Sequence, residues 1–191
     1  MSANVWFEQV ERGLIKEIKE TVKCKNHKGI LTPLDDNAII IRKPEEDFKI
    51  EVFPSVSIYN TSYKFDSLRY NSQPIVVDVN EEEKTLLMEE SAIPFNLDYQ
   101  LDFWSEYQED MNDMTRTWLM KHFRQFNLNV VDDGGVERSC NCSMTNSITK
   151  SDIVTGDKRL FHSIISYRIW VELDDQTRYN VSMVTDTNIN V

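Results

Sequence analysis

Within the stretch Pro94–Trp104, PFNLDYQLDFW, the residues Phe95–Phe103 alternate apolar and polar side chains without a break. Its odd positions are all apolar: Phe95, Leu97, Tyr99, Leu101 and Phe103. Successive side chains of a strand point to opposite sides of a sheet, so this pattern predicts a strand with one buried and one solvated face. We expect a fixed register, because a slip of one residue would bury Asp98 and Asp102.

A helix is expected directly after this strand. Ser105–Gln108 (SEYQ) has the spacing of a capping box, in which the serine and the glutamine each satisfy a backbone N–H. Three acidic residues, Glu106, Glu109 and Asp110, lie near the positive end of this helix. Its apolar stripe comprises Tyr107, Met111, Met114, Trp118 and Leu119, and extends to His122 and Phe123.

The chain opens with another amphipathic helix, Val5–Val22. Its apolar residues recur at every fourth position: Trp6, Val10, Leu14, Ile18 and Val22. Gly13 is expected to weaken this helix by about 1 kcal/mol without breaking it.

The region between the two helices reads as β structure. Ala38–Ile41 predicts a short buried strand, and Ile50–Ile58 alternates but contains Pro54, which favours an edge strand or a bulge. Residues 60–74 have no sustained period and predict a projecting loop or ragged hairpin. Ile75–Val79 and Thr85–Met88 then predict a hairpin around a charged turn.

Further strands are expected after the second helix. They are Phe126–Val131, Val136–Ile148 and Phe161–Leu173, and Asp174–Thr177 is expected to close a hairpin onto Tyr179–Met183. The sequence therefore predicts a single α+β domain over residues 1–191, with a frayed tail at 186–191. We expect a mainly antiparallel sheet with both amphipathic helices packed on one face and a projecting loop at 60–74.

Composition excludes several classes of protein. The 191 residues include 32 acidic and 21 basic ones, for a formal net charge of −11. Such a surface repels nucleic-acid backbones and anionic membranes. We expect no membrane span, and no secretory signal because Glu8 and Glu11 stand near the start. Three cysteines, an odd number, fit reduced thiols in the cytosol better than a disulfide framework.

Metal chemistry has one candidate set. Cys24, His27, Cys140 and Cys142 are zinc-type ligands, but the two pairs are far apart in sequence, and Cys140 and Cys142 would share a strand face as small core residues. A metal site and buried thiols are both open at this point.

Catalytic motifs are not evident in the sequence. There is no Gly-x-Ser-x-Gly elbow and no phosphate-binding glycine loop, and the acidic pairs stand in expected turns. His162 lies in an apolar strand and is interpreted as structural. We therefore expect no enzyme activity, no catalytic residues, no bound metal and no cofactor.

Aromatic residues outside the predicted core suggest an interaction surface. Trp104 and Trp170 stand on the polar sides of their strands, and the 60–74 loop carries Tyr63, Phe65, Arg69 and Tyr70. Such residues either pack under a helix or anchor a partner protein, since Tyr, Trp and Arg are enriched at interfaces. We take the four loop residues as the candidate interaction site.

The segment Ser91–Ser105 (SAIPFNLDYQLDFWS), with the acidic, Met-rich helix that ends at Phe123, resembles neck and tail-terminator (tail-completion) proteins of long-tailed bacteriophages. The resemblance implies a structural virion protein of the tail or neck, made in the host cytoplasm. Such proteins form rings, generally hexameric, that cap the tail tube and join it to the head-side connector. Implied partners are the chain itself, tail-tube and sheath proteins, and the connector. DNA would pass without specific binding, and the 60–74 loop would be an arm.

Two other functions remain open on the sequence. One is a zinc-stabilised domain or small zinc enzyme that uses Cys24, His27, Cys140 and Cys142. The other is an acidic cytosolic adaptor or inhibitor that mimics nucleic acid by its charge, although the carboxylates are spread through turns and helix ends rather than along one segment.

Overall fold

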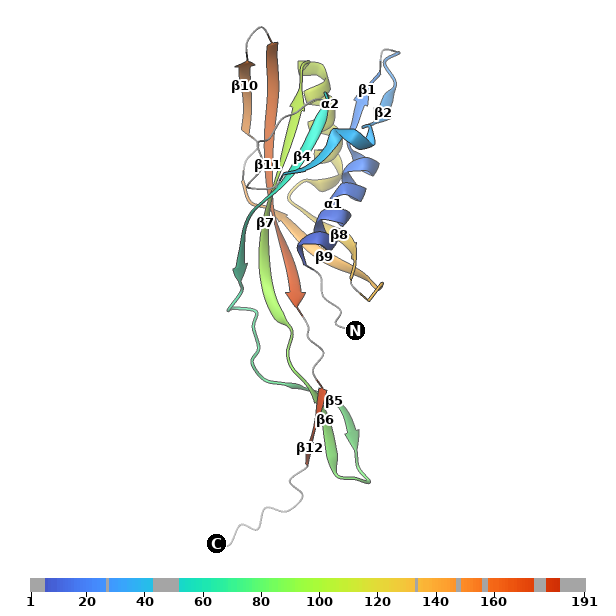
Figure 1. Ribbon diagram of the computed structural model, residues 1–191, viewed down its shortest axis with the longest axis vertical. Coiled ribbons are helices and arrows are strands. Elements are labelled where there is room, and N and C mark those ends of the chain that lie inside the picture. The colour runs from blue at the N-terminus through green and yellow to red at the C-terminus, as the bar shows by residue number, and fades with distance from the viewer. Residues whose placement is uncertain are drawn as a thin grey trace.

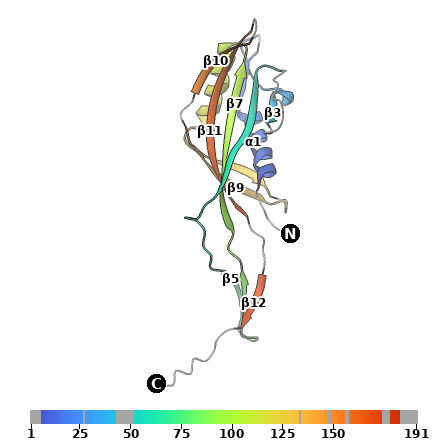
Figure 2. The same cartoon turned by 60° about the vertical axis from the view of Figure 1, so that its left-hand side comes forward.

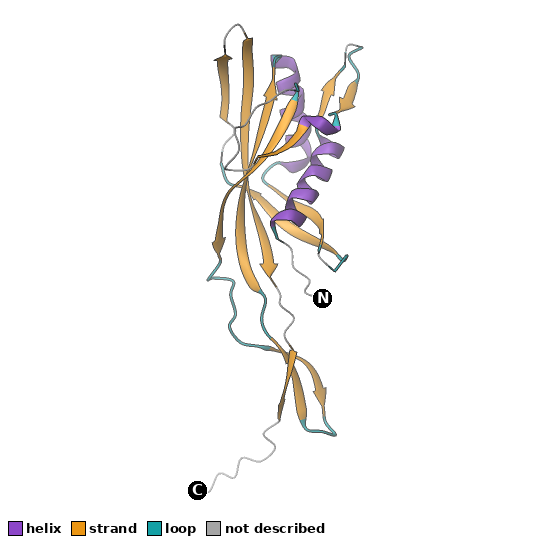
Figure 3. Cartoon of the chain, viewed as in Figure 1, coloured by secondary structure: helices purple, strands orange, loops and turns teal. Residues whose placement is uncertain are grey.

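The chain is a mixed α+β protein that is mostly sheet, with two α-helices (Figures 1 and 3). The computed structural model describes residues 6–26, 28–42, 52–132, 134–146, 149–155, 158–173 and 178–182. The helices are α1 (Phe7–Thr21) and α2 (Gln108–His122), and a short 3-10 turn, η1, spans Asp36–Ala38. The α+β class predicted from sequence is confirmed.

Among the described residues, the main sheet has seven strands in the order β3-β4-β7-β11-β9-β8, with β10 also paired to β11. Their bounds are β3 Ile39–Arg42, β4 Ser55–Phe65, β7 Ile93–Ser105, β8 Gln125–Val131, β9 Glu137–Met144, β10 Thr149–Thr155 and β11 Lys158–Leu173. All pairs are antiparallel except β3 with β4. A separate hairpin joins β1 (Lys23–Lys25) to β2 (Leu31–Pro33).

The predicted strand around Tyr99 is β7, and it lies at the centre of the sheet between β4 and β11. Leu97, Tyr99, Leu101 and Phe103 are buried, as the alternation predicts. The opposite face is not uniformly solvated, and there the expectation is wrong for Asp102, which is fully buried. Its carboxylate is compensated by Arg42, whose NH1 lies 3.0 Å from Oδ2.

Helix α2 begins later than the capping box predicts. Ser105 is still the last residue of β7, and its Oγ accepts a hydrogen bond from the backbone N–H of Tyr107, the N-cap residue. The prediction of a buried stripe is confirmed at Met111, Met114 and Trp118 but wrong at Tyr107 and Phe123, which are exposed. Strand pairing continues through Ser105 because Phe161 of β11 is its partner.

Helix α1 follows its prediction closely. Val10, Leu14, Ile18 and Val22 are buried, while Val5 lies outside the described residues.

The glycine in this helix has a packing role. A Cβ on Gly13 would lie 2.9 Å from Val130 Cγ1 and 3.1 Å from the Asn129 carbonyl oxygen of β8, so only glycine permits this close approach.

The predicted loop at 60–74 and the interpretation of Pro54 need correction. Residues 60–65 belong to β4, so the connection covers only residues 66–74. Pro54 precedes β4, which is an interior strand, so it marks neither an edge strand nor a bulge. The bulge lies instead between Asn60 and Ser62. The predicted strand residue Ile50 lies outside the described part of the chain.

A second sheet lies apart from the main sheet, toward the C-terminal end of the chain (Figures 1 and 2). It has the order β12-β6-β5, from β5 (Ile75–Asn80), β6 (Thr85–Glu89) and β12 (Arg178–Ser182). The predicted β5–β6 hairpin is confirmed. The predicted hairpin of residues 179–183 onto Phe161–Leu173 is wrong, because β12 pairs with β6. Residues 174–177 and the tail at 186–191 lie outside the described residues. We call this second sheet, with its β5–β6 turn, the arm.

Candidate interaction surface

The four candidate interaction residues lie where β4 leads into the arm. Tyr63 and Phe65 are on the last part of β4, and Arg69 and Tyr70 are on the connection to β5. The three rings are substantially exposed, at 59% for Tyr63, 48% for Phe65 and 40% for Tyr70. The structure therefore brings these residues together at one end of the main sheet.

Their rings belong to an aromatic cluster that extends to the start of α1. Tyr63 meets Trp6 and Phe7 edge-on, with centroids 6.0 and 5.5 Å apart. Phe65 lies 5.4 Å from Tyr70 and 6.0 Å from Phe95 in the same manner. Because edge-to-face pairs add to the free energy of burial, the cluster stabilises the packing of the last part of β4 against the start of α1.

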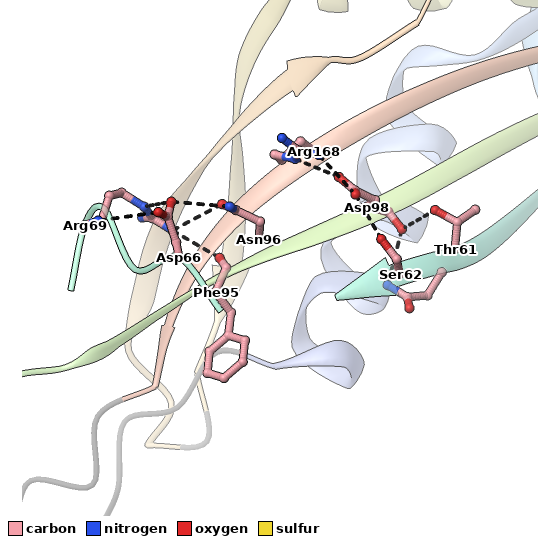
Figure 4. Close-up of polar contacts among 9 residues, drawn as sticks. Thr61, Ser62, Asp66, Arg69, Phe95, Asn96, Asp98 and Arg168 are labelled. Atoms are coloured by element: carbon pink, nitrogen blue, oxygen red, sulfur yellow. Dashed lines mark hydrogen bonds and ion pairs between the residues drawn. The ribbon is translucent and has the colours of Figure 1, made fainter. Parts of the chain in front are cut away.

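Arg69 joins the connection at residues 66–74 to strand β7 by hydrogen bonds (Figure 4). Its Nε donates to Asp66 Oδ2 at 2.8 Å, and its NH2 donates to the Phe95 carbonyl oxygen at 3.1 Å. Asn96 Nδ2 donates to the same Asp66 oxygen at 3.3 Å. The Arg69 guanidinium holds the pKa of Asp66 below its ordinary value. Arg69 is thus engaged within its own chain and links the connection to β7.

A second set of hydrogen bonds joins β4, β7 and β11 on the polar face (Figure 4). Arg168 donates from Nε and NH2 to the two carboxylate oxygens of Asp98, at 2.8 and 3.2 Å. Ser62 Oγ donates to the same carboxylate at 2.9 Å, and Thr61 at the bulge donates to the Asp98 carbonyl oxygen. Burial alone would raise the pKa of Asp98, but the hydrogen bonds from Arg168 and Ser62 lower it.

The arm has one wholly apolar face. Cross-strand partners point to the same side of a sheet, and the register pairs Met88 with Val76 and Tyr179, and Leu86 with Val79 and Val181. We call this the arm face; it comprises Val76, Val79, Leu86, Met88, Tyr179 and Val181. The bulge between Val76 and Asp78 breaks the alternation along β5, so sequence periodicity alone did not identify the arm face.

Helix α2 carries an apolar patch on its exposed side. Met120 is 81% exposed and Phe123 54% exposed. With Leu119 they line a shallow groove of about 520 Å³, whose other lining residues are Asn112, Thr115 and Arg116. We call this the α2 groove. Met120 is an apolar residue off the predicted stripe, and this is a signal that sequence analysis could have used, whereas the spacing of Phe123 placed it in the stripe.

A polar cluster is buried on the face of β7 that carries Asp102. Gln100 donates to Asp102 Oδ1 at 2.7 Å, and His162 Nε2 lies 3.3 Å from the same oxygen. The His162 ring stacks on Trp104, with centroids 3.7 Å apart. The cluster links β7 to β11, so the structural interpretation of His162 is consistent with its contacts.

Ser151 gives this cluster the composition of a catalytic triad. Its Oγ lies 3.4 Å from His162 Nδ1, and the carboxylate already accepts from Arg42. A nucleophile and its base typically lie about 2.6–3.2 Å apart, and this contact is often longer in the absence of a substrate.

The cysteines of the predicted metal set are separated in the fold. Cys24 lies on β1, where its Sγ contacts the Asp110 carbonyl oxygen of α2, whereas Cys140 and Cys142 are on β9. His27 lies outside the described residues. Burial raises the pKa of Cys24 to about 12 and that of Cys140 to about 11. In the described ranges, no three His, Cys, Asp or Glu side chains are placed to hold a metal.

No protein-family model matches the chain, and no curated protein matches it in sequence. Within the described ranges, no helix has the length and hydrophobicity needed to cross a membrane.

Proposed function

We propose that the chain is a structural protein of the virion of a long-tailed bacteriophage. In this proposal it forms a ring, hexameric as in the proteins that it resembles, at the head-side end of the tail tube. The ring ends tube growth and joins the tube, and the sheath where the tail has one, to the head-side connector. The proposal gives the protein no enzymatic step and no cofactor.

The observation that carries the proposal is the arm, a small sheet with an exposed apolar face, placed apart from the main sheet. Val76 and Val79 are 47% and 49% exposed. A soluble chain seldom leaves such a surface uncovered, because exposed apolar patches mark sites of association. The resemblance of the Pro94–Phe123 segment supplies the identity of the assembly.

In the assembled ring, α1 and α2 lie together on one face of the main sheet. The net charge of −11 gives the passage a surface over which DNA slides, because like charges repel the phosphate backbone. DNA therefore passes the ring without being held by it.

The proposal is tested with the tail-tube protein encoded in the same genome. Purified chain is added while tubes polymerise, and tube lengths are measured by electron microscopy. We expect shorter tubes and chain that sediments with them. An unrelated acidic protein of similar size and charge is the control. Tubes of unchanged length, with the chain left in the supernatant, would overturn the proposal.

A further inference from the structure

The apolar residues of the arm face are not buried by the sheet to which they belong. Val76, Val79 and Val181 are exposed by between 36% and 49%, although the register places them on one continuous apolar face. A three-stranded sheet gains independent stability chiefly by burying such a face. A flat apolar surface of a partner would supply that burial.

The α2 groove is a surface of this kind. Its lining is largely apolar and shallow, with Met120 and Phe123 standing out from the helix. A shallow groove fits the flat face of a β-sheet better than it fits a single inserted side chain. The two surfaces are therefore matched in polarity.

The charged residues beside the arm face and those beside the α2 groove are opposite in sign. The turn of the arm carries three consecutive glutamates, Glu81–Glu83, which are exposed. Arg124 supplies positive charge at the edge of the α2 groove, where its guanidinium lies over the Phe123 ring, 5.4 Å from the centroid. Arg116 also lines the groove, and its NH2 pairs with Asp113 Oδ1 at 3.1 Å within the same helix. Opposite charges around an apolar centre favour association, whereas two arms placed face to face would bring their glutamates together.

The position of the two surfaces excludes a contact within one chain. The arm lies at one end of the long axis of the molecule, and α2 lies toward the other end (Figure 1). A contact between two different surfaces on two copies is head-to-tail, and such contacts generate closed rings when the rotation closes.

We propose that the arm face of one chain docks on the α2 groove of a second copy. This inference rests on the proposed ring, because it names the contact between neighbouring subunits. The apolar residues of the arm face cover Leu119, Met120 and Phe123 of the neighbour. Glu81–Glu83 lie beside the neighbour's basic residues Arg116 and Arg124.

Cysteine cross-linking between two variants tests the contact. Met88→Cys marks the arm face and Met120→Cys marks the α2 groove, and the two proteins are mixed with a short bismaleimide. The native cysteines are buried, with Cys24 and Cys140 at raised pKa, so the introduced thiols react first. We expect a cross-linked dimer from the mixture and none from either variant alone. Leu87→Cys, on the other face of β6, replaces Met88→Cys as the matched control and is expected to give none.

Three outcomes would overturn the inference. Cross-linked dimers of Met88→Cys alone would mean that arm faces pair with each other. A ring without a mixed cross-link would mean that the arm face contacts another protein, such as the tube, and would leave the proposed function standing. A chain that neither associates with itself nor binds tube ends would remove both proposals. Conversely, a mixed cross-link within an open filament would keep the contact and contradict the ring.

Charge reversal gives an independent measurement that does not depend on introduced thiols. Glu82→Lys and Arg124→Glu are each expected to weaken self-association about two- to fivefold in sedimentation velocity, the range of single surface charges. The mixture of the two variants should recover association, because one contact then has its charges exchanged. Equal weakening in the mixture would argue against this pairing.

Discussion

Arg168 of β11 holds Asp98 of β7 with two hydrogen bonds, from Nε to Oδ1 at 2.8 Å and from NH2 to Oδ2 at 3.2 Å. Ser62 of β4 donates to the same carboxylate, so one side chain joins three strands next to the base of the arm. The side chain of Arg168 is 39% exposed and that of Asp98 is 19% exposed, so the pair is partly buried. Such a pair contributes more than an exposed one, because its loss leaves a partly buried donor unpaired.

Removal of this carboxylate should destabilise the sheet. Asp98→Ala leaves Arg168 and Ser62 without their acceptor, and we expect the free energy of unfolding to fall by about 1–3 kcal/mol. Urea unfolding followed by circular dichroism measures it. Glu8→Gln, in the fully solvated pair with Arg12, is the control and should change little. Equal effects of the two substitutions would contradict the role given to Asp98.

Gly13→Ala should destabilise the protein although alanine favours helices. The added Cβ would lie 2.9 Å from Val130 Cγ1, so α1 has to move away from β8. We expect a net loss of about 1–3 kcal/mol, typical of overpacking. Val130→Ala in the same chain removes the contacting methyl group and should recover part of the loss. A Gly13→Ala protein that is more stable than the wild type would show that α1 and β8 do not pack this closely.

His122 should make stability depend on pH in the acidic range. Burial lowers its pKa to about 4, although Glu17 lies 3.1 Å from Nε2. The unfolded chain takes up this proton near pH 6.5 and the folded chain only near pH 4, so stability falls as the pH drops through that window.

Glu17 makes stability depend on pH in the same direction. Burial alone would raise its pKa, but Lys121 lowers it below the ordinary value, and stability is therefore lost as this carboxylate is protonated.

The measurement is the urea midpoint between pH 7 and pH 4 for wild type and His122→Gln. The variant lacks the buried group that must be protonated, so its midpoint should fall less steeply between pH 6.5 and 4. Parallel curves for the two proteins would show that His122 does not carry this dependence.

Chelation should leave the protein unchanged. Cys24 lies on β1 and the other two cysteines on β9, and among the residues that the structure describes no three His, Cys, Asp or Glu side chains are placed to hold a metal. We expect EDTA to leave the melting temperature unaltered and the native thiols to react slowly with a thiol reagent, because burial raises their pKa. The denatured chain, in which all thiols react, is the control. One equivalent of zinc per chain in elemental analysis would instead support the zinc-stabilised alternative.

Much of the main sheet could be predicted because its pattern is local. The alternation around Tyr99 identified β7, and the spacing of Val10, Leu14 and Ile18 identified the buried side of α1. Neither depends on knowing which segments are neighbours in space. The same holds for the β5–β6 hairpin, whose turn lies between two short apolar runs.

The errors concern contacts between distant segments. Burial of Asp102 requires Arg42, which is 60 residues away in sequence. Asp174–Thr177 has the composition of a hairpin turn, yet β12 pairs with β6 because Leu86 and Met88 offer apolar partners to Val181 and Tyr179. The arm face was missed for the same reason, since only the pairing register brings Val76 and Val79 to one side.

We propose that this chain forms a closed ring at one end of a phage tail tube. Cryo-electron microscopy of tail tubes incubated with the purified chain would show such a ring. We predict a closed ring at the head-side end of the tube, into which copies of this chain fit with each α2 groove covered by the arm of its neighbour. Tubes with bare ends, alongside a chain that stays monomeric, would contradict the account.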